Sequence, residues 1–296
     1  MGKLLKKSFY KQRQDFENSC KERDKVLSLP DNIEIKTNIK YSDDDCLAHR
    51  LDIYRPKDKT NEILPVIINI HGGGLLLGNK EFNKYFCAEI SSLGFMVYSI
   101  EYRLVPDCNF FDQLDDVSRA MDYINSRIIS DNGDPSHIYG TADSGGAFLL
   151  LYSVAMQKSK SLEQATNIKA SIINFKALAF ISGMFYTTKF DKIGLFLPSY
   201  LYGKKYKKSI FAPYTNPENP EIISSLLPCY LVTSHNDFLQ NYTLNFEKAL
   251  TNYNIPHKLD NYPKNSELTH AFSVFKPFIK ESKDTIKSMI DFLTQY

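Results

Sequence analysis

Residues 71–74 read His-Gly-Gly-Gly and directly follow a strongly apolar run, residues 64–70. Three adjacent glycines let the backbone turn sharply and leave its N–H groups uncovered by side chains. Amides of this kind are the donors that stabilise negative charge developing on a carbonyl oxygen. A flexible turn is the alternative interpretation, although a glycine run costs conformational entropy and stabilises nothing by itself. The pattern favours an oxyanion-binding loop.

A second segment places Ser144 between a predicted strand, residues 137–142, and an apolar helix. Small residues, Ala142 and Gly146, stand two positions before and after the serine. This is the spacing of the G-x-S-x-G turn, which exposes a serine hydroxyl at the end of a strand, here with Ala142 in place of the first glycine. A serine that caps the following helix would occupy the same position. Ser144 is therefore a candidate nucleophile, with helix capping as its alternative role.

A serine hydroxyl attacks a carbonyl only when a base takes its proton and a carboxylate orients that base. Asp237 follows the predicted strand 229–235, and His270 lies beyond the predicted strand 257–262. The chain order Ser144, Asp237, His270 is the order of α/β-hydrolases and differs from that of chymotrypsin and subtilisin. These three residues are the predicted catalytic group.

Other residues compete for the roles of base and acid. His235 is the main competing base, because it lies two residues before Asp237 and therefore on the same face of the strand. Asp143 and Glu267 are alternative acids, but Asp143 is expected to point away from a base across the turn. The remaining histidines are interpreted as structural: His49, His71, His137 and His257.

The sequence predicts no cofactor and no metal. Gly73 and Gly78 have the G-x-x-x-x-G spacing of a phosphate-binding loop, but Asn79 and Lys80 stand where that loop needs Lys and then Ser or Thr. The cysteines are scattered and form neither a C-x-x-C pair nor a disulfide framework. They are Cys20, Cys46, Cys87, Cys108 and Cys229. A reducing, cytoplasmic setting fits this usage.

The composition is that of a folded chain with little net charge. The 296 residues are 43% hydrophobic and 24% charged, and 36 Lys and Arg against 34 Asp and Glu give a net charge of +2. These values argue against disorder and against nucleic acid as a partner. No run approaches the roughly 18 apolar residues of a membrane span, and the basic N-terminus has no signal-peptide core. A cytoplasmic protein without stable membrane anchoring is expected.

Predicted strands and helices alternate along the chain. The strands begin at residues 33, 47, 64, 95, 137, 177, 229 and 257, and the helices cover residues 80–93, 111–129, a stretch from about 145, 239–253 and a stretch after 280. Alternation implies right-handed crossovers, so the prediction is an α/β fold with a mostly parallel central sheet and helices on both faces. Residues 186 to about 222 are too long for a simple connection and are interpreted as an insertion over the sheet.

Four motifs in register resemble the HGGG-type carboxylesterases, the hormone-sensitive-lipase-like branch of the α/β-hydrolase superfamily. They are residues 71–74; Tyr102-Arg103-Leu104-Val105-Pro106 with Leu114-Asp115-Asp116-Val117; Asp134-Pro135-Ser136-His137-Ile138 leading to Asp143-Ser144-Gly145-Gly146; and Asp237 with His270-Ala271-Phe272. The resemblance covers about residues 33–296. It departs from the family pattern at Ala142, Gly145, Ala147 and Ala271, where Gly, Ala, Gly and Gly are usual.

The resemblance implies an α/β-hydrolase fold and a serine esterase mechanism. In that mechanism Ser144 is the nucleophile, His270 is the general base and then acid, and Asp237 orients the histidine. The implied oxyanion hole consists of the N–H groups of Gly73, Gly74 and Gly145.

The resemblance also implies a cap over the site, with residues 1–30 as N-terminal cap helices and an insertion near 186–210 on the catalytic domain 31–296. Apolar cap residues could line an acyl pocket or simply bury the cap; they are Phe185, Tyr186, Phe190, Phe196, Leu197, Tyr200, Leu201 and Tyr202. The expected substrate is a small-molecule carboxylic ester with a short to medium acyl chain. A hydrolase-fold protein that binds a small ligand with little or no turnover and a deacetylase of acetylated sugars stay open as alternatives. A homo-oligomer is compatible with the sequence.

Overall fold

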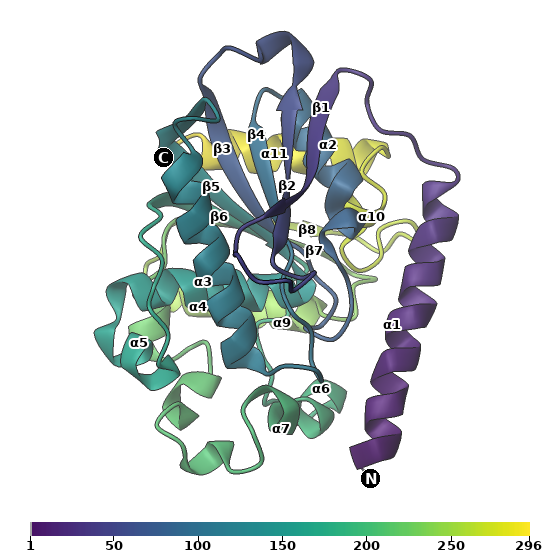
Figure 1. Ribbon diagram of the computed structural model, residues 1–296. Coiled ribbons are helices and arrows are strands. Elements are labelled where there is room, and N and C mark those ends of the chain that lie inside the picture. The colour runs from purple at the N-terminus through teal and green to yellow at the C-terminus, as the bar shows by residue number, and fades with distance from the viewer. Residues whose placement is uncertain (1) are drawn as a thin grey trace.

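The computed structural model describes residues 2–296, and an eight-stranded sheet forms the centre of this part of the chain (Figure 1). The strands are β1 (Ile33–Lys40), β2 (Arg50–Pro56), β3 (Leu64–Ile70), β4 (Met96–Ile100), β5 (Gly133–Asp143), β6 (Phe175–Ile181), β7 (Cys229–Ser234) and β8 (His257–Tyr262), in the order β1-β2-β4-β3-β5-β6-β7-β8. β1 and β2 pair antiparallel with their neighbours, and the other strands pair parallel. The predicted mostly parallel sheet is confirmed.

Helices cover both faces of the sheet, as predicted. In β3, Val66, Ile68 and Ile70 face one hydrophobic core while Ile67 faces the other, which explains why this strand is apolar throughout. The first core packs against α3 (Phe110–Arg127), α4 (Ser144–Lys158) and α9 (Gln240–Asn252). The second packs against α2 (Lys84–Ser92) and α11 (Lys280–Leu293). Because β3 to β8 run parallel, their carboxyl ends lie at the same end of the sheet, between the two layers of helices.

The N-terminal segment is one helix, α1 (Gly2–Asp24), where several cap helices were predicted; Met1 lies outside the described residues. The helix stands beside the sheet (Figure 1). It is held by ring contacts of Phe9 and Phe16 and by two arginines. Arg13 donates to the carbonyl oxygens of Leu76 and Val105, each at 3.1 Å, and Arg23 donates to the carbonyl of Phe82 at 2.9 Å. Within the described part of the chain, no helix is both long and apolar enough to span a membrane.

The insertion after β6 is built from short helices. These are α6 (Lys192–Phe196), α7 (Pro198–Leu201), η3 (Tyr206–Lys208), η4 (Ala212–Thr215) and α8 (Pro220–Ile223). Tyr202 and Phe211 bury their rings against Phe110 of α3, so the segment is packed onto the body of the molecule. Further short elements that the sequence patterns did not predict are η1 (Lys57–Lys59), α5 (Lys160–Thr166) and α10 (Phe272–Phe275). The helix predicted over residues 80–93 begins as a 3₁₀ turn, η2 (Lys80–Asn83), and continues as α2.

Asp116 of α3 is the central acceptor of a buried ionic cluster. Its fully buried carboxylate accepts hydrogen bonds from the backbone and guanidinium of Arg103 and lies 3.0 Å from His49 Nε2 and 3.1 Å from Arg119 Nη2. The cluster joins the segment after β4 to α3. It gives a structural role to Arg103 and Asp116, which belong to the quoted sequence motifs but take no part in the catalytic chemistry.

Replacing Asp116 by Ala is expected to lower the free energy of unfolding by about 3 kcal/mol or more, because two guanidinium groups lose their shared buried carboxylate. Urea denaturation followed by circular dichroism measures the change. Asp115→Ala is the matched control: Asp115 is half-exposed and, within residues 2–296, pairs with Arg119 alone, so its loss should cost less than about 1 kcal/mol. Equal losses for the two variants would contradict the role of the cluster.

Candidate active site

Ser144 stands at the sharp junction of β5 and α4. It is the first residue of α4 and has φ = +46°, a left-handed conformation that side chains rarely adopt. The turn brings α4 very close to the end of β3: a Cβ on Gly146 would lie 2.2 Å from the carbonyl oxygen of Ile70 and 2.5 Å from that of His71. Only glycine fits at that position. This steric limit explains why a small residue stands two positions after the serine.

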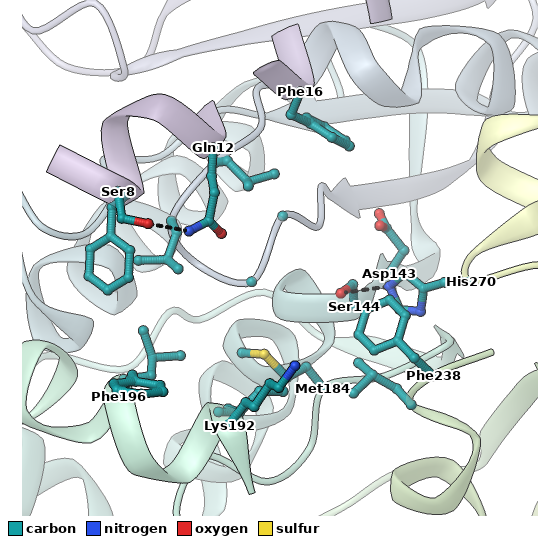
Figure 2. A pocket seen from close by; sticks show the side chains of 18 of the residues that line it. Ser8, Gln12, Phe16, Asp143, Ser144, Met184, Lys192, Phe196, Phe238 and His270 are labelled. Atoms are coloured by element: carbon teal, nitrogen blue, oxygen red, sulfur yellow. Dashed lines mark hydrogen bonds between the residues drawn. The ribbon is translucent and has the colours of Figure 1, made fainter. Parts of the chain in front are cut away.

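The structure brings the three predicted catalytic side chains into one hydrogen-bonded chain. His270 Nε2 lies 3.0 Å from Ser144 Oγ (Figure 2). On the other side of the ring, His270 Nδ1 lies 2.6 Å from Asp237 Oδ1. Asp237 follows β7, and an isolated bridge between Asn236 and Thr269 holds the two loops side by side. His270 is 126 positions from Ser144 and 33 positions from Asp237 in the sequence. The three residues nevertheless meet at the carboxyl ends of the strands.

The carboxylate of Asp237 is buried but well supplied with donors. Its Oδ1 also accepts from the backbone N–H of Leu239 at 2.8 Å, and its Oδ2 accepts from the hydroxyl of Thr233 at 2.9 Å. Burial alone would raise the pKa of Asp237, but hydrogen bonding to His270 and the charge of that ring outweigh it, so the net pKa is lowered. The carboxylate is thus ionised and able to hold the Nδ1–H of His270.

The competing residues have other partners. His235 is exposed, and its backbone N–H pairs with the carbonyl of Tyr262. Glu267 pairs with Lys276 at 2.8 Å. Asp143 lines the same cavity as Ser144, but its Oδ1 accepts from Gly72 N–H at 2.9 Å and Asn83 Nδ2 at 2.8 Å.

The glycine loop borders the same cavity as Ser144 and His270. Gly73 and Gly74 have φ = +114° and +60°. Among residues 2–296, the N–H groups of these two glycines donate to no protein acceptor. A Cβ on Gly145 would lie 2.9 Å from the Gly74 amide nitrogen, so the first turn of α4 and the loop are in direct contact. The N–H groups of the three glycines named from the sequence therefore belong to segments that meet beside Ser144.

A cavity of about 570 Å³ opens in front of Ser144, within the size range of small-molecule sites. Its walls are mostly apolar and come from four places: Leu5, Ser8, Phe9, Gln12 and Phe16 of α1; Leu76 and Leu77 of the glycine loop; Met184, Lys192, Ile193, Phe196 and Leu197 after β6; and Phe238, Leu239 and Phe275 near the histidine. Figure 2 shows the Ser8–Gln12 pair on one side of the cavity and Phe196 and Lys192 on another.

Sequence reasoning found only part of this lining. Of the eight apolar cap residues considered, Phe196 and Leu197 line the cavity, whereas Phe190 is 97% exposed. The sequence analysis missed Phe238, whose ring centroid lies 4.2 Å from that of His270. Its position directly after Asp237 was a signal that could have identified it. Met184 and Phe275 were also missed, and no motif marks them.

One cluster outside the cavity has metal-ligand residue types. Ligand atoms of Asp44, Cys46 and His49 lie within 4.8 Å of one another. However, His49 already uses both ring nitrogens on Asp44 and Asp116, and Arg119 lies 3.6 Å from Asp44. The acidic groups are thus occupied by cations of the protein itself, and the cluster is explained without a metal.

A family model described as BD-FAE matches residues 51–237 of the chain. The chain belongs to the BD-FAE family. The match spans the glycine loop, Ser144 and Asp237, and it ends before His270.

Several curated relatives of the chain are named as esterases. A probable isoprenylcysteine alpha-carbonyl methylesterase of Oryza sativa subsp. japonica is 29% identical over 61% of this chain and 44% of its own length, so the chain spans less than half of this curated relative. Versiconal hemiacetal acetate esterase of Dothistroma septosporum is 24% identical over 86% of this chain and 79% of its own length.

Esterase B of Lactobacillus rhamnosis, solved with a C4-C4 tributyrin phosphonate inhibitor, superposes with a TM-score of 0.92 at 21% identity, over 100% of this chain and 96% of that chain. An esterase of the bacterial hormone-sensitive lipase family superposes with a TM-score of 0.73 at 17% identity, over 96% of this chain and 90% of that chain. The predicted α/β-hydrolase fold and the resemblance to HGGG-type esterases are confirmed.

Arg13 ties α1 to the rim of the cavity, because its guanidinium binds the carbonyls of Leu76 and Val105. Arg13→Ala is expected to speed hydrogen exchange of the α1 amides about tenfold, since three charge-assisted hydrogen bonds disappear, the third being to Asp107 at 3.2 Å. Hydrogen–deuterium exchange with mass spectrometry measures this. Gln14→Ala, which removes only an exposed contact within the helix to Asn18, should leave exchange unchanged, and identical exchange in both variants would contradict the tether.

Proposed function

We propose that this protein is a serine carboxylesterase that hydrolyses small carboxylic esters through an acyl-enzyme intermediate. The observation that supports this most directly is the hydrogen-bonded chain from Ser144 through His270 to Asp237, located where the cavity meets the glycine loop. In this proposal Ser144 is the nucleophile, His270 is the base and then the acid, and Asp237 orients the imidazole.

The mechanism follows from the hydrogen-bond donors and acceptors at the site. As Ser144 Oγ attacks the ester carbonyl, its proton passes to His270 Nε2, and Asp237 stabilises the imidazolium that forms. The carbonyl oxygen becomes an oxyanion, which the N–H groups of Gly73, Gly74 and Gly145 stabilise. Gly145 also heads α4, whose N-terminal end favours negative charge. His270 then protonates the leaving alcohol, and a water molecule activated by the same ring releases the acid.

The comparisons support the same reaction class. The relatives and neighbours named above are a methylesterase, an acetate esterase and other esterases by name. Their names refer to small acyl or alkyl groups in several cases, among them a methyl ester, an acetate and a C4 phosphonate. We infer that this chain also acts on esters with a short to medium acyl chain.

The cavity supports that substrate class. Its apolar walls suit an alkyl chain, and its two wall segments, α1 and the helices after β6, close it on opposite sides (Figure 2). We infer that residues 1–30 and the insertion near 186–210 together form a cap over the catalytic domain 31–296. Free thiols at all five cysteines support a reducing, cytoplasmic location.

Ser144→Ala and His270→Ala are each expected to lower kcat for p-nitrophenyl butyrate by about 10⁴-fold or more, because the attacking oxygen or its base is lost. His235→Ala is the matched control, since this exposed imidazole is close to Asp237 in sequence and does not line the cavity; it should keep wild-type activity. Each variant is compared by steady-state kinetics after circular dichroism has shown that it is folded.

Unchanged hydrolysis by folded Ser144→Ala would contradict the nucleophile assignment. Failure of the folded wild-type protein to hydrolyse any ester of the series would favour a ligand-binding role instead.

Phe9 is buried in the cavity wall and packs edge-on against Tyr200 at 5.2 Å. Phe9→Ala is expected to shift the preferred acyl length toward longer chains, because about 100 Å² or more of aromatic surface leaves the wall. Relative kcat/KM for p-nitrophenyl esters from C2 to C12 measures the shift. Phe190→Ala is the control, because its exposed ring lies outside the cavity lining. An unchanged profile in Phe9→Ala would place the acyl chain elsewhere.

A further inference from the structure

Glu101 bridges the two ends of the glycine loop. It follows β4, and its Oε1 lies 3.1 Å from His71 Nε2 at the start of the loop, while its Oε2 accepts from the backbone N–H of Lys80 at 2.9 Å at the end. The backbone of Glu101 is itself fixed, since its carbonyl accepts from Tyr41 Oη and its N–H donates to the carbonyl of Arg50. One rigidly held carboxylate therefore sets both ends of the loop.

His71 is fully buried between this carboxylate and the loop backbone. Its Nδ1 lies 2.7 Å from the carbonyl oxygen of Gly72, and its ring stacks on Tyr102 with centroids 4.3 Å apart. Tyr102 also donates to the carbonyl of His71 at 2.8 Å, so both the backbone and the ring are held. Both ring nitrogens face acceptor oxygens, an arrangement that the doubly protonated ring satisfies.

The charge of His71 has several sources. Burial by itself would lower the pKa of His71, but the charge and hydrogen bond of Glu101, the carbonyl of Gly72 and the charge of Asp143 raise it. The net pKa of His71 is raised, which favours the protonated ring between the carboxylate on one side and the peptide carbonyl on the other.

The hydrogen bond to Gly72 controls the orientation of the next amide. The Gly72–Gly73 peptide is trans, so its C=O and N–H point in opposite directions. Fixing the carbonyl toward His71 therefore fixes the Gly73 N–H away from it. Gly78, with φ = +104°, packs directly on this contact: a Cβ there would lie 2.6 Å from Gly72 O and 2.9 Å from His71 Nδ1. The contact is therefore buried and closely packed.

We propose that Glu101 and His71 are positioning residues for the oxyanion hole, acting through the Gly72–Gly73 peptide. The carboxylate holds the imidazolium, the imidazolium Nδ1–H fixes and polarises the peptide carbonyl, and the N–H of Gly73 becomes an oriented, stronger donor to the oxyanion. No proton is transferred along this chain. The inference rests on the proposed esterase function, and it assigns a role to a histidine that otherwise only begins the glycine run.

The test separates orientation of the amide from general loosening of the loop. His71→Ala is expected to lower kcat for p-nitrophenyl butyrate about 10- to 100-fold with KM within about threefold, because one of three donors is misdirected in the transition state. The Ki of butylboronic acid, which forms a tetrahedral anion on the serine oxygen, should rise in the same proportion. His71→Asn, whose side-chain N–H can take the place of Nδ1–H, should recover at least about a fifth of the wild-type kcat.

Two further variants complete the design. Glu101→Gln keeps the shape of the side chain and an acceptor for the Lys80 N–H but leaves His71 neutral, so kcat should fall about 3- to 10-fold. Gln113→Ala removes a buried donor to the carbonyl of Leu75 in the same loop and should destabilise the protein while changing kcat less than about threefold.

Several results would overturn the inference. They are unchanged kcat in His71→Ala and Glu101→Gln, a loss expressed only in KM, no recovery in folded His71→Asn, or an equal loss of kcat in Gln113→Ala. Any of them in an active wild-type protein would refute the role of His71 and leave the esterase proposal intact. An inactive wild-type protein would instead contradict the proposed function.

Discussion

The structure depends on the turn at which β5 becomes α4 without an intervening loop. Ser144 must leave the strand, change to a left-handed conformation and start the helix within one residue. This is sterically feasible only because Gly146 lets the helix approach the carbonyls at the end of β3 and Gly145 touches the glycine loop. The close approach brings a hydroxyl, a helix N-terminus and uncovered amides into the same small volume. Neither a longer linker nor larger side chains would bring them together.

Much of this arrangement could be predicted from the sequence because it is local. The apolar run of β3 and the alternating pattern of β8 gave the observed strand boundaries, and the glycine and serine motifs lie at the carboxyl ends of strands, where open α/β sheets place their sites. Asp237 and His270 were found by their positions after predicted strands. The hydrogen bonds that join them depend on the strand order, which is not visible in the sequence. Parallel pairing from β5 through β6 and β7 to β8 places the loops after these strands at the same end of the sheet.

What the sequence did not reveal depends on long-range packing. Helix α1 provides a wall of the cavity, yet Ser8 and Gln12 differ in no way from the other polar residues of that helix until its placement against the loop is known. The helix was expected to be several helices, but no residue between Gly2 and Asp24 interrupts it, and it ends at Asp24, before Pro30. Met184 and Phe275 enter the cavity because the strands that precede them end beside Ser144. Their residue types alone carry no signal.

Backbone strain marks the site independently of any motif. Eight non-glycine residues of the described chain have positive φ, and four of them are asparagines, which tolerate this conformation well. The other four are Leu75, Ser144, Ser182 and Ala271. All four surround the proposed triad: Leu75 follows Gly74, Ser182 accepts from the N–H of Ala271 at 2.9 Å, and Ala271 follows His270.

Each of these four conformations costs about 1–3 kcal/mol, and such cost persists only where surrounding contacts fix the backbone. Those contacts are present, since Gln113 and Val105 bind the carbonyl of Leu75 and the N–H of Ser182 pairs with Val232. Glycine adopts this conformation without strain, whereas Ala271 adopts it although it carries a side chain. The surrounding fold, rather than the residue type, therefore determines where the imidazole of His270 points.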